Sequence, residues 1–245
     1  LGVNGIFMEV HDNPEVAKCD GPTQLYLRDL ESFLDDLNIP KKIILDKYNI
    51  YIGFDSSNFG QELSAEVCKR SILKETRIAD KKKININFIK LKELRDRHLY
   101  WREYDNLSAT EFTYSRFLTP YLNNYQGWAL FCDSDFLYRC DIKDVFDSIE
   151  LDETKAVYLV KHPEDLQESG VKMNNKPQSS YIRKNWTSMM IINCGHESCR
   201  KLTPEVVNTQ TGSYLHRLEW CNDNEIGELN PTYNFLVENY VSLEL

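Results

Sequence analysis

The sequence predicts an α/β protein with a mostly parallel central sheet, and three stretches of the chain carry this prediction. One is the apolar run that follows Gly127 and ends at Asp133 and Asp135. The others are strand-like segments at 50–55 and 84–91, separated by a helix-like segment at 61–74. A strand–helix–strand order implies a right-handed crossover between parallel strands. A wholly apolar run bounded by charge is typical of a strand buried on both faces of such a sheet.

The remaining elements follow from periodicity and capping signals. A capping box at Ser108–Glu111 predicts a helix through Leu122, disturbed near its end by Pro120. The polar segment 162–183 has no periodic pattern and reads as a long binding loop or lid. Further elements are expected in this order: a helix at 141–149, strands at 156–161 and 184–194, helices beginning at His196 and Thr203, a helix at 211–220 and a helix start at 223–227.

Domain organisation is predicted from where these patterns begin. Residues 1–47 are expected to form an N-terminal extension with one helix at 23–37, because four leucines there fall on one helical stripe. Residues 48–245 are expected to form the main α/β domain. At 245 residues the chain is long enough for one sizeable core with an appendage.

Composition limits the classes of partner. The formal net charge is −9, which argues against nucleic acid or an anionic membrane as a general partner. No apolar run reaches the length of a transmembrane helix, and no signal peptide is visible, although the chain starts at Leu1. The seven cysteines, an odd number without a C-x-x-C pair, favour reduced thiols. We therefore expect a cytoplasmic protein, or the soluble domain of a longer one; the sequence leaves the oligomeric state open.

Asp133 and Asp135 are the first candidates for chemistry. They follow the buried run, at the edge where open α/β sheets bind ligands. Residues two apart share one face of an extended chain, so both carboxylates can meet one Mg²⁺ or Mn²⁺ ion. The alternative is a pair of solvated acids at a strand end, because composition alone yields about one such spacing by chance. No Gly-rich phosphate loop is present, so something else must neutralise the phosphates of a bound nucleotide, and this favours a metal held by Asp133 and Asp135.

Five segments in this order resemble a known family: Ile50–Asp55, the Tyr114-Ser115-Arg116-Phe117-Leu118-Thr119-Pro120 stretch, Phe131–Asp135, Ser188–Asn193 and Asp223–Ile226. Together they resemble the GT-A-fold nucleotide-sugar glycosyltransferases, most nearly glycosyltransferase family 8. The resemblance covers roughly residues 48–240 and implies a single Rossmann-like domain with helices flanking the sheet.

The resemblance also implies site residues. Asp133 and Asp135 match the metal-binding D-x-D, with Mn²⁺ or Mg²⁺ holding the diphosphate of a donor that is expected to be a UDP-sugar. Arg116 matches a donor-contacting arginine, and Asp223 and Asn224 match the pair that faces the anomeric carbon. The remaining donor-binding candidates are Ile52, Gly53, Phe54, Asp55, Ser134, Lys184, Trp186 and Ser188. The family's further histidine ligand near the C-terminus has no counterpart here. Either that end is missing from this chain, or His216 or another group substitutes as the third metal ligand, or the protein binds the metal weakly.

The function that follows is a metal-dependent hexosyltransferase, expected to retain the anomeric configuration. It would move a sugar from the nucleotide-sugar to a glycan, protein or small-molecule acceptor. Two alternatives stay open. One is a non-catalytic GT-A-like scaffold within a larger glycosylation protein. The other is a nucleotidyltransferase, which would need a basic Gly-rich loop that this sequence lacks.

Overall fold

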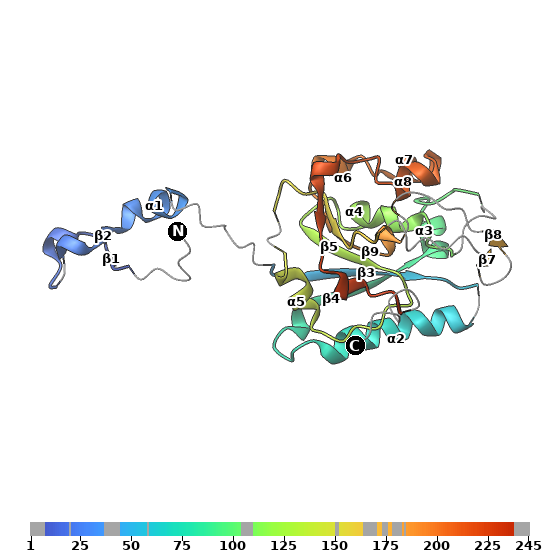
Figure 1. The fold of residues 1–245 in the computed structure, drawn as a ribbon, viewed down its shortest axis with the longest axis horizontal. Coiled ribbons are helices and arrows are strands. Elements are labelled where there is room, and N and C mark those ends of the chain that lie inside the picture. Colours follow the sequence, from blue (N-terminus) through green and yellow to red (C-terminus); the bar gives the residue numbers. More distant parts are fainter. Residues whose placement is uncertain are drawn as a thin grey trace. The chain divides into compact units, whose positions relative to one another are not determined.

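The computed structural model divides into two compact units, Leu1–Ile43 and Ile44–Leu245, which are described separately (Figure 1). The structure describes residues 8–19, 21–36, 45–57, 59–103, 110–149, 152–163, 171–172, 176–177, 183 and 185–237. None of the described helices is long and apolar enough to cross a membrane.

The described residues of the N-terminal unit form one short parallel ladder and four short helices. Strands β1 (Val10–His11) and β2 (Leu25–Tyr26) pair with each other. The helices are η1 (Pro14–Val16), η2 (Gly21–Thr23), η3 (Leu27–Asp29) and α1 (Leu30–Asp36). The predicted helix at 23–37 therefore starts late, at Leu30, because Leu25 and Tyr26 pair with β1 instead.

A six-stranded sheet forms the centre of the second unit, in the order β10-β6-β9-β5-β3-β4. Its strands are β3 (Tyr48–Phe54), β4 (Ile84–Lys90), β5 (Trp128–Cys132), β6 (Val157–Leu159), β9 (Met189–Asn193) and β10 (Ile226–Glu228). Strand β9 runs antiparallel to both of its neighbours, and all other pairs are parallel. The predicted α/β class with a mostly parallel sheet is confirmed.

Helices cover both faces of this sheet (Figure 1). Helix α2 (Phe59–Glu75) lies on one face, and α4 (Thr119–Leu122), α6 (Glu197–Arg200), α7 (Pro204–Thr209) and α8 (Gly212–His216) lie on the other. The shorter elements are α3 (Leu91–Asp96), α5 (Ile142–Asp147), β7 (Val171–Lys172), β8 (Lys176–Pro177), η4 (Lys81–Lys83), η5 (Ser115–Leu118), η7 (Trp186–Ser188), η8 (Asp223–Glu225) and η9 (Pro231–Asn234).

Strand β5 shows how the core is divided between the two faces. Its five residues are all buried, as the apolar run predicts. Phe131 belongs to the cluster that includes Phe112 and Phe117, whereas the Cys132 thiol lies 3.8 Å from Cys68 of α2. Alternate residues of one strand therefore fill two separate layers of the core.

Four predicted elements of the second unit differ from the structure. The strand expected at 184–194 begins only at Met189, because 186–188 form η7. The helix expected through Leu122 is two short helices, η5 and α4, and Pro120 lies in the first turn of α4, where its missing N–H costs nothing. Its capping residues Ser108 and Ala109 lie outside the described residues. The helix expected at 211–220 ends at His216, and Leu218 has a left-handed φ of 60°. Within 162–183, β7 pairs with β8 where no structure was expected.

Candidate active site

A cavity of about 1040 Å³ opens beside the carboxyl end of β5. Its polar lining comprises Asp133, Asp135, Arg139, Asn185, Ser188, Thr232 and Asn234, together with the Cys140 thiol. Its apolar lining comprises Phe136, Leu137, Tyr138, Tyr233, Phe235, Leu236 and Val237. The cavity therefore lies at the sheet edge where open α/β proteins bind ligands.

Asp133 and Asp135 both line this cavity. The Asp133 side chain is 21% exposed, and its backbone N–H donates to the Ser188 carbonyl at 2.8 Å, which ties the end of β5 to η7. Asp135 is exposed. Mg²⁺ is commonly held by one or two carboxylates together with substrate phosphates, so this pair fits a hard divalent ion that a diphosphate completes. Within the described residues no group of three His, Cys, Asp or Glu side chains could hold a metal without such help.

Arg116 lies behind Asp133, and the cavity lining does not include it. The Nη1 atom of its buried guanidinium forms an ion pair with Asp133 Oδ1 at 2.7 Å and donates a hydrogen bond to the Thr187 carbonyl at 2.9 Å. Its Nε donates to the Thr113 carbonyl at 3.1 Å, and the group packs against the Phe131 ring. Arg116 therefore positions one aspartate and η7, whereas the resemblance implied direct contact with the donor.

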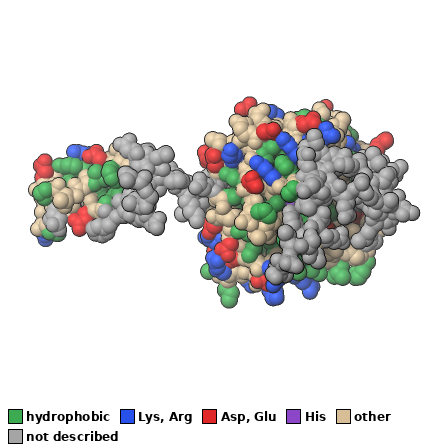
Figure 2. Space-filling view, in the orientation of Figure 1, with side chains coloured by type: hydrophobic (Ala, Val, Ile, Leu, Met, Phe, Trp, Pro, Cys, Tyr) green, Lys and Arg blue, Asp and Glu red, His purple; other side chains and the backbone are tan. Residues whose placement is uncertain are grey.

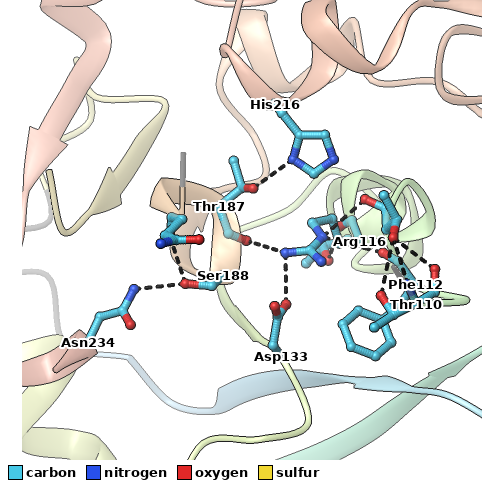
Figure 3. Close-up of polar contacts among 11 residues, drawn as sticks. Thr110, Phe112, Arg116, Asp133, Thr187, Ser188, His216 and Asn234 are labelled. Atoms are coloured by element: carbon cyan, nitrogen blue, oxygen red, sulfur yellow. Dashed lines mark hydrogen bonds and ion pairs between the residues drawn. The ribbon is translucent and has the colours of Figure 1, made fainter. Parts of the chain in front are cut away.

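His216 is connected to this network through Thr187 (Figure 3). Its Nδ1 shares a hydrogen bond with Thr187 Oγ1 at 2.9 Å, and its ring packs edge-on against Phe117 with centroids 5.1 Å apart. Figure 3 shows Arg116 between Asp133 and Thr187, with His216 beyond Thr187. The structure thus brings His216 into the same hydrogen-bonded chain as Asp133 but does not group it with Asp133 and Asp135 as a metal ligand.

The predicted nucleotide edge at the end of β3 is occupied by internal contacts. Ile52 is fully buried, and a Cβ at Gly53 would lie 2.6 Å from the Phe112 ring. The carboxylate of Asp55 is also buried and accepts from the N–H groups of Ser57 (2.8 Å) and Glu111 (3.2 Å). None of these residues, nor the half-buried Phe54, lines the cavity.

Among the other residues expected to contact the donor, one lines the cavity and two described ones do not. Ser188 lines the cavity, and its hydroxyl accepts from the Asn234 amide at 2.9 Å. Ser134 is buried and lies outside the lining, and Trp186 donates its indole N–H to the His162 carbonyl at 2.9 Å. Lys184 lies outside the described residues.

Asp223 and Asn224 lie at the amino ends of the parallel strands, whereas the cavity lies at their carboxyl ends. They precede β10, which is parallel to β6, and both strands point in the same direction as β5 because β9 is antiparallel to β5 and β6. Asp133 follows the carboxyl end of β5, whereas Asp223 precedes the amino end of β10. Asp223 instead pairs with Arg183, and the carbonyl of Asn224 accepts from Lys155.

Sequence reasoning missed four polar residues of the cavity: Arg139, Asn185, Thr232 and Asn234. Arg139 has a usable signal, because it is the first cation after the aspartate pair. Asn185 adopts a left-handed φ of 65°, which Asn tolerates better than most residues. Asn234 follows Asn230-Pro231, which signals the start of a helix but does not predict that the Asn234 side chain faces the cavity.

The thiol and phenol beneath the cavity are held neutral. Burial raises the pKa of the Cys132 thiol well above its usual value, and the neighbouring Cys68 raises it further. Burial likewise raises the pKa of Tyr138 well above 10. Neither group therefore supplies an anion at neutral pH.

Sequence comparison finds relatives for the chain, although no family model matches it. Protein CDI of Arabidopsis thaliana is 45% identical over 189 residues, which covers 77% of this chain and 69% of that protein. 2-Dehydro-3-deoxyphosphooctonate aldolase 1 of Arabidopsis thaliana is 48% identical over 52 residues. That match covers 21% of this chain and only 18% of the aldolase.

Structural comparison shows the type of fold. The apo structure of the WbbM bifunctional glycosyltransferase superposes on 77% of this chain and 40% of its own, with a TM-score of 0.50 and 14% identity. The six-stranded mixed sheet with helices on both faces is therefore the GT-A type of fold that the five sequence segments predicted.

Proposed function

This chain belongs to the family of Protein CDI from Arabidopsis thaliana, and from its fold and cavity we propose that it is a metal-dependent glycosyltransferase. One observation carries the proposal. In a GT-A-type fold, Asp133 and Asp135 follow the central strand and both line a cavity of about 1040 Å³ at the ligand-binding edge. We propose that the donor is a nucleotide-sugar, specifically a UDP-sugar. We also propose that the protein carries out the sugar transfer typical of glycosyltransferase family 8, which its sequence resembles.

The metal site is Asp133 and Asp135, completed by the donor diphosphate. Arg116 fixes the direction of the Asp133 carboxylate, so this side of the site is formed before any ligand arrives. When bound, Mn²⁺ or Mg²⁺ supplies Lewis-acid stabilisation of the charge that grows on the departing nucleotide. His216 holds Thr187, which in turn accepts from Arg116, and so it supports the site without being a ligand.

Arg139 takes the phosphate-contacting role that the resemblance gave to Arg116. It is exposed and is the one cationic side chain in the described lining of the cavity. A guanidinium matches phosphate oxygens in a forked geometry. Asn185, Ser188 and Asn234 add amide and hydroxyl groups of the kind that bind sugar hydroxyls.

The stereochemistry we propose is retention. An inverting enzyme needs a carboxylate base for the acceptor in addition to the metal-binding pair. The described lining contains no carboxylate besides Asp133 and Asp135, and Asp223 lies at the amino ends of the parallel strands, away from the cavity. The acceptor is a glycan, protein or small molecule, and NMR of the anomeric proton of the first-formed product tests the stereochemistry.

The decisive experiment measures release of the nucleoside diphosphate from UDP-sugars in the presence of Mn²⁺. We expect Asp135→Asn to lower this rate by at least about a hundredfold, a size typical of losing a transition-state electrostatic contact. We expect Arg139→Ala to weaken UDP binding about tenfold, which corresponds to one lost charge-assisted hydrogen bond. Asp223→Asn is the matched control and should keep the wild-type rate. Wild-type turnover by Asp135→Asn would refute the metal role, and release of pyrophosphate in place of UDP would indicate a nucleotidyltransferase.

A second candidate function is a non-catalytic scaffold, and the Asp133–Arg116 ion pair favours it. One oxygen of the first aspartate is already 2.7 Å from a buried cation, which competes with a metal for that oxygen. Isothermal calorimetry with UDP and Mn²⁺ separates the two functions. Metal-dependent heat of UDP binding supports the transferase, and its absence in the wild-type protein supports the scaffold.

A further inference from the structure

The outward side of α2 carries a line of large apolar side chains. Phe59, Leu63 and Val67 are 78%, 51% and 44% exposed. They are spaced four residues apart, so they lie on one stripe of the helix. The opposite stripe contains Ala65 and Cys68, both fully buried against the sheet. Single exposed apolar residues are normal on a protein surface, but three in a row on one helix mark a contact surface.

Basic residues follow the apolar ones along the chain, and Arg70 and Lys74 lie on the same stripe of α2. Arg70 and Lys74 are exposed on the last turns of α2, and Lys81–Lys83 are exposed in η4. From Phe59 to Lys83 there are seven Lys and Arg against four Asp and Glu, although the whole chain has a net charge of −9. Figure 2 shows hydrophobic and Lys or Arg side chains along the lower edge of the larger unit, where α2 runs in Figure 1.

We propose that this α2 ridge, defined as Phe59, Leu63, Val67, Arg70 and Lys74, binds the surface of an anionic phospholipid bilayer. The two kinds of side chain match the two layers of such a surface. Apolar side chains enter the boundary between headgroups and acyl chains, while Lys and Arg pair with anionic headgroups. Nucleic acid fits less well, because Phe59 and Leu63 would face phosphates. The acidic remainder of the chain is repelled by the same bilayer, which orients the molecule with α2 towards it.

Flotation of the full chain with lipid vesicles tests the proposal. The vesicles are phosphatidylcholine alone or with 15 and 30 mol % phosphatidylserine, as our chosen range for cytoplasmic-leaflet charge. We expect binding to increase with phosphatidylserine and to fall several-fold as salt rises. The pair Phe59→Ser and Leu63→Ser should weaken binding about tenfold, and the pair Arg70→Glu and Lys74→Glu should weaken it by at least as much.

The controls make the same chemical changes elsewhere on the surface. Trp101→Ser removes another exposed aromatic side chain, and the pair Lys92→Glu and Arg97→Glu makes the same change in net charge on α3 and its C-cap residue. These variants should bind vesicles as the wild type does, and all variants should keep the wild-type unfolding midpoint because the changed side chains are exposed.

Three results would overturn the proposal. The first is equal binding of the ridge and control variants to anionic vesicles, and the second is absence of wild-type binding to these vesicles. The third is a concentration-dependent dimer that the Phe59 and Leu63 substitutions dissociate while vesicles bind nothing, which would assign the ridge to a second copy of the chain. Neither readout uses sugar transfer, so this test is independent of the proposed enzyme activity.

Discussion

At the scale of single residues, the contact between Gly53 and Phe112 explains why β3 carries a glycine near its end. Phe112 is 2% exposed, and its ring fills the space where a side chain at Gly53 would begin, with two ring atoms 2.6 Å from a Cβ built there. We expect Gly53→Ala to lower the free energy of unfolding by about 1–3 kcal/mol, the usual cost of overpacking a core. Urea denaturation measures this.

The matched control for that change is Gly195→Ala, whose nearest neighbour would be 3.6 Å away. It should change stability by less than about 0.5 kcal/mol, as surface substitutions without a special feature do. Replacing Phe112 by Leu in the Gly53→Ala background should recover part of the loss by making room. A Gly53→Ala protein as stable as the wild type would show that the ring moves aside at no cost.

Arg116 provides a second residue-scale prediction, because its guanidinium joins three segments of the chain. Arg116→Lys keeps the positive charge but loses the planar guanidinium, whose Nη1 contacts Asp133 Oδ1 and the Thr187 carbonyl while its Nε donates to the Thr113 carbonyl. We expect a loss of about 1–3 kcal/mol in unfolding free energy, the cost of leaving buried polar groups unpaired. We also expect weaker Mn²⁺-dependent UDP binding by calorimetry.

Arg200→Lys is the comparison for Arg116→Lys. Arg200 is exposed, and it also donates to two backbone carbonyls, those of Gly195 and Tyr125. Its substitution should cost little, because water replaces the lost contacts. Equal effects of the two substitutions on stability and on UDP binding would contradict the positioning role of Arg116.

At the scale of elements, Asn208 of α7 holds the segment that follows α3. Its buried side chain accepts from the N–H groups of Trp101 (2.7 Å) and Arg102 (2.8 Å) and donates to the Leu99 carbonyl (3.1 Å). We expect Asn208→Ala to cost about 2–4 kcal/mol in unfolding free energy, since several buried groups lose their partners together. Hydrogen exchange should show faster exchange of the Trp101 and Arg102 amides.

Asn85→Ala is the corresponding control in β4. Asn85 is exposed and its side chain makes one bond, to Asn49 at 3.0 Å. It should cost no more than a few tenths of a kcal/mol. Unchanged exchange at Trp101 and Arg102 in Asn208→Ala would mean that the segment is held by other contacts.

Elements that depend on local patterns were predicted well, and those that depend on distant partners were not. The strands β3, β4 and β5 and the helix α2 follow from apolar runs and periodicity, and they lie close to the predicted ranges. The antiparallel direction of β9 depends on how its flanking connections run, which no residue of 189–193 encodes. The short α8 shows the same limit, because the turn at Leu218 ends a helix that periodicity would continue.

The candidate site divides in the same way. The aspartate pair is visible in sequence because both residues follow one strand. The chain of contacts from Asp133 through Arg116 and Thr187 to His216 is not visible, since it joins four separate parts of the fold. Asp223 was placed in the site by the order of motifs along the chain. That order does not show that Asp223 precedes β10 and therefore lies at the amino ends of the parallel strands, away from Asp133.

At the scale of the whole molecule, the division into Leu1–Ile43 and Ile44–Leu245 leads to a prediction about independent folding. Every strand of the six-stranded sheet, and every described residue of its main hydrophobic cluster, belongs to the second unit. In the described part of the first unit Pro14 is the one buried residue, and a piece of this size rarely forms a core of its own.

Residues 44–245 alone should therefore unfold cooperatively with a midpoint within a few degrees of the full chain. They should also keep the Mn²⁺-dependent UDP binding proposed for Asp133 and Asp135, because every described residue of the cavity lies in this unit. Calorimetric scanning of both proteins measures the midpoints, and limited proteolysis should yield a resistant fragment that begins near Ile44. A drop of more than about ten degrees on removing residues 1–43 would contradict the prediction, since it would show that the first unit contributes on the order of 3–5 kcal/mol to stability.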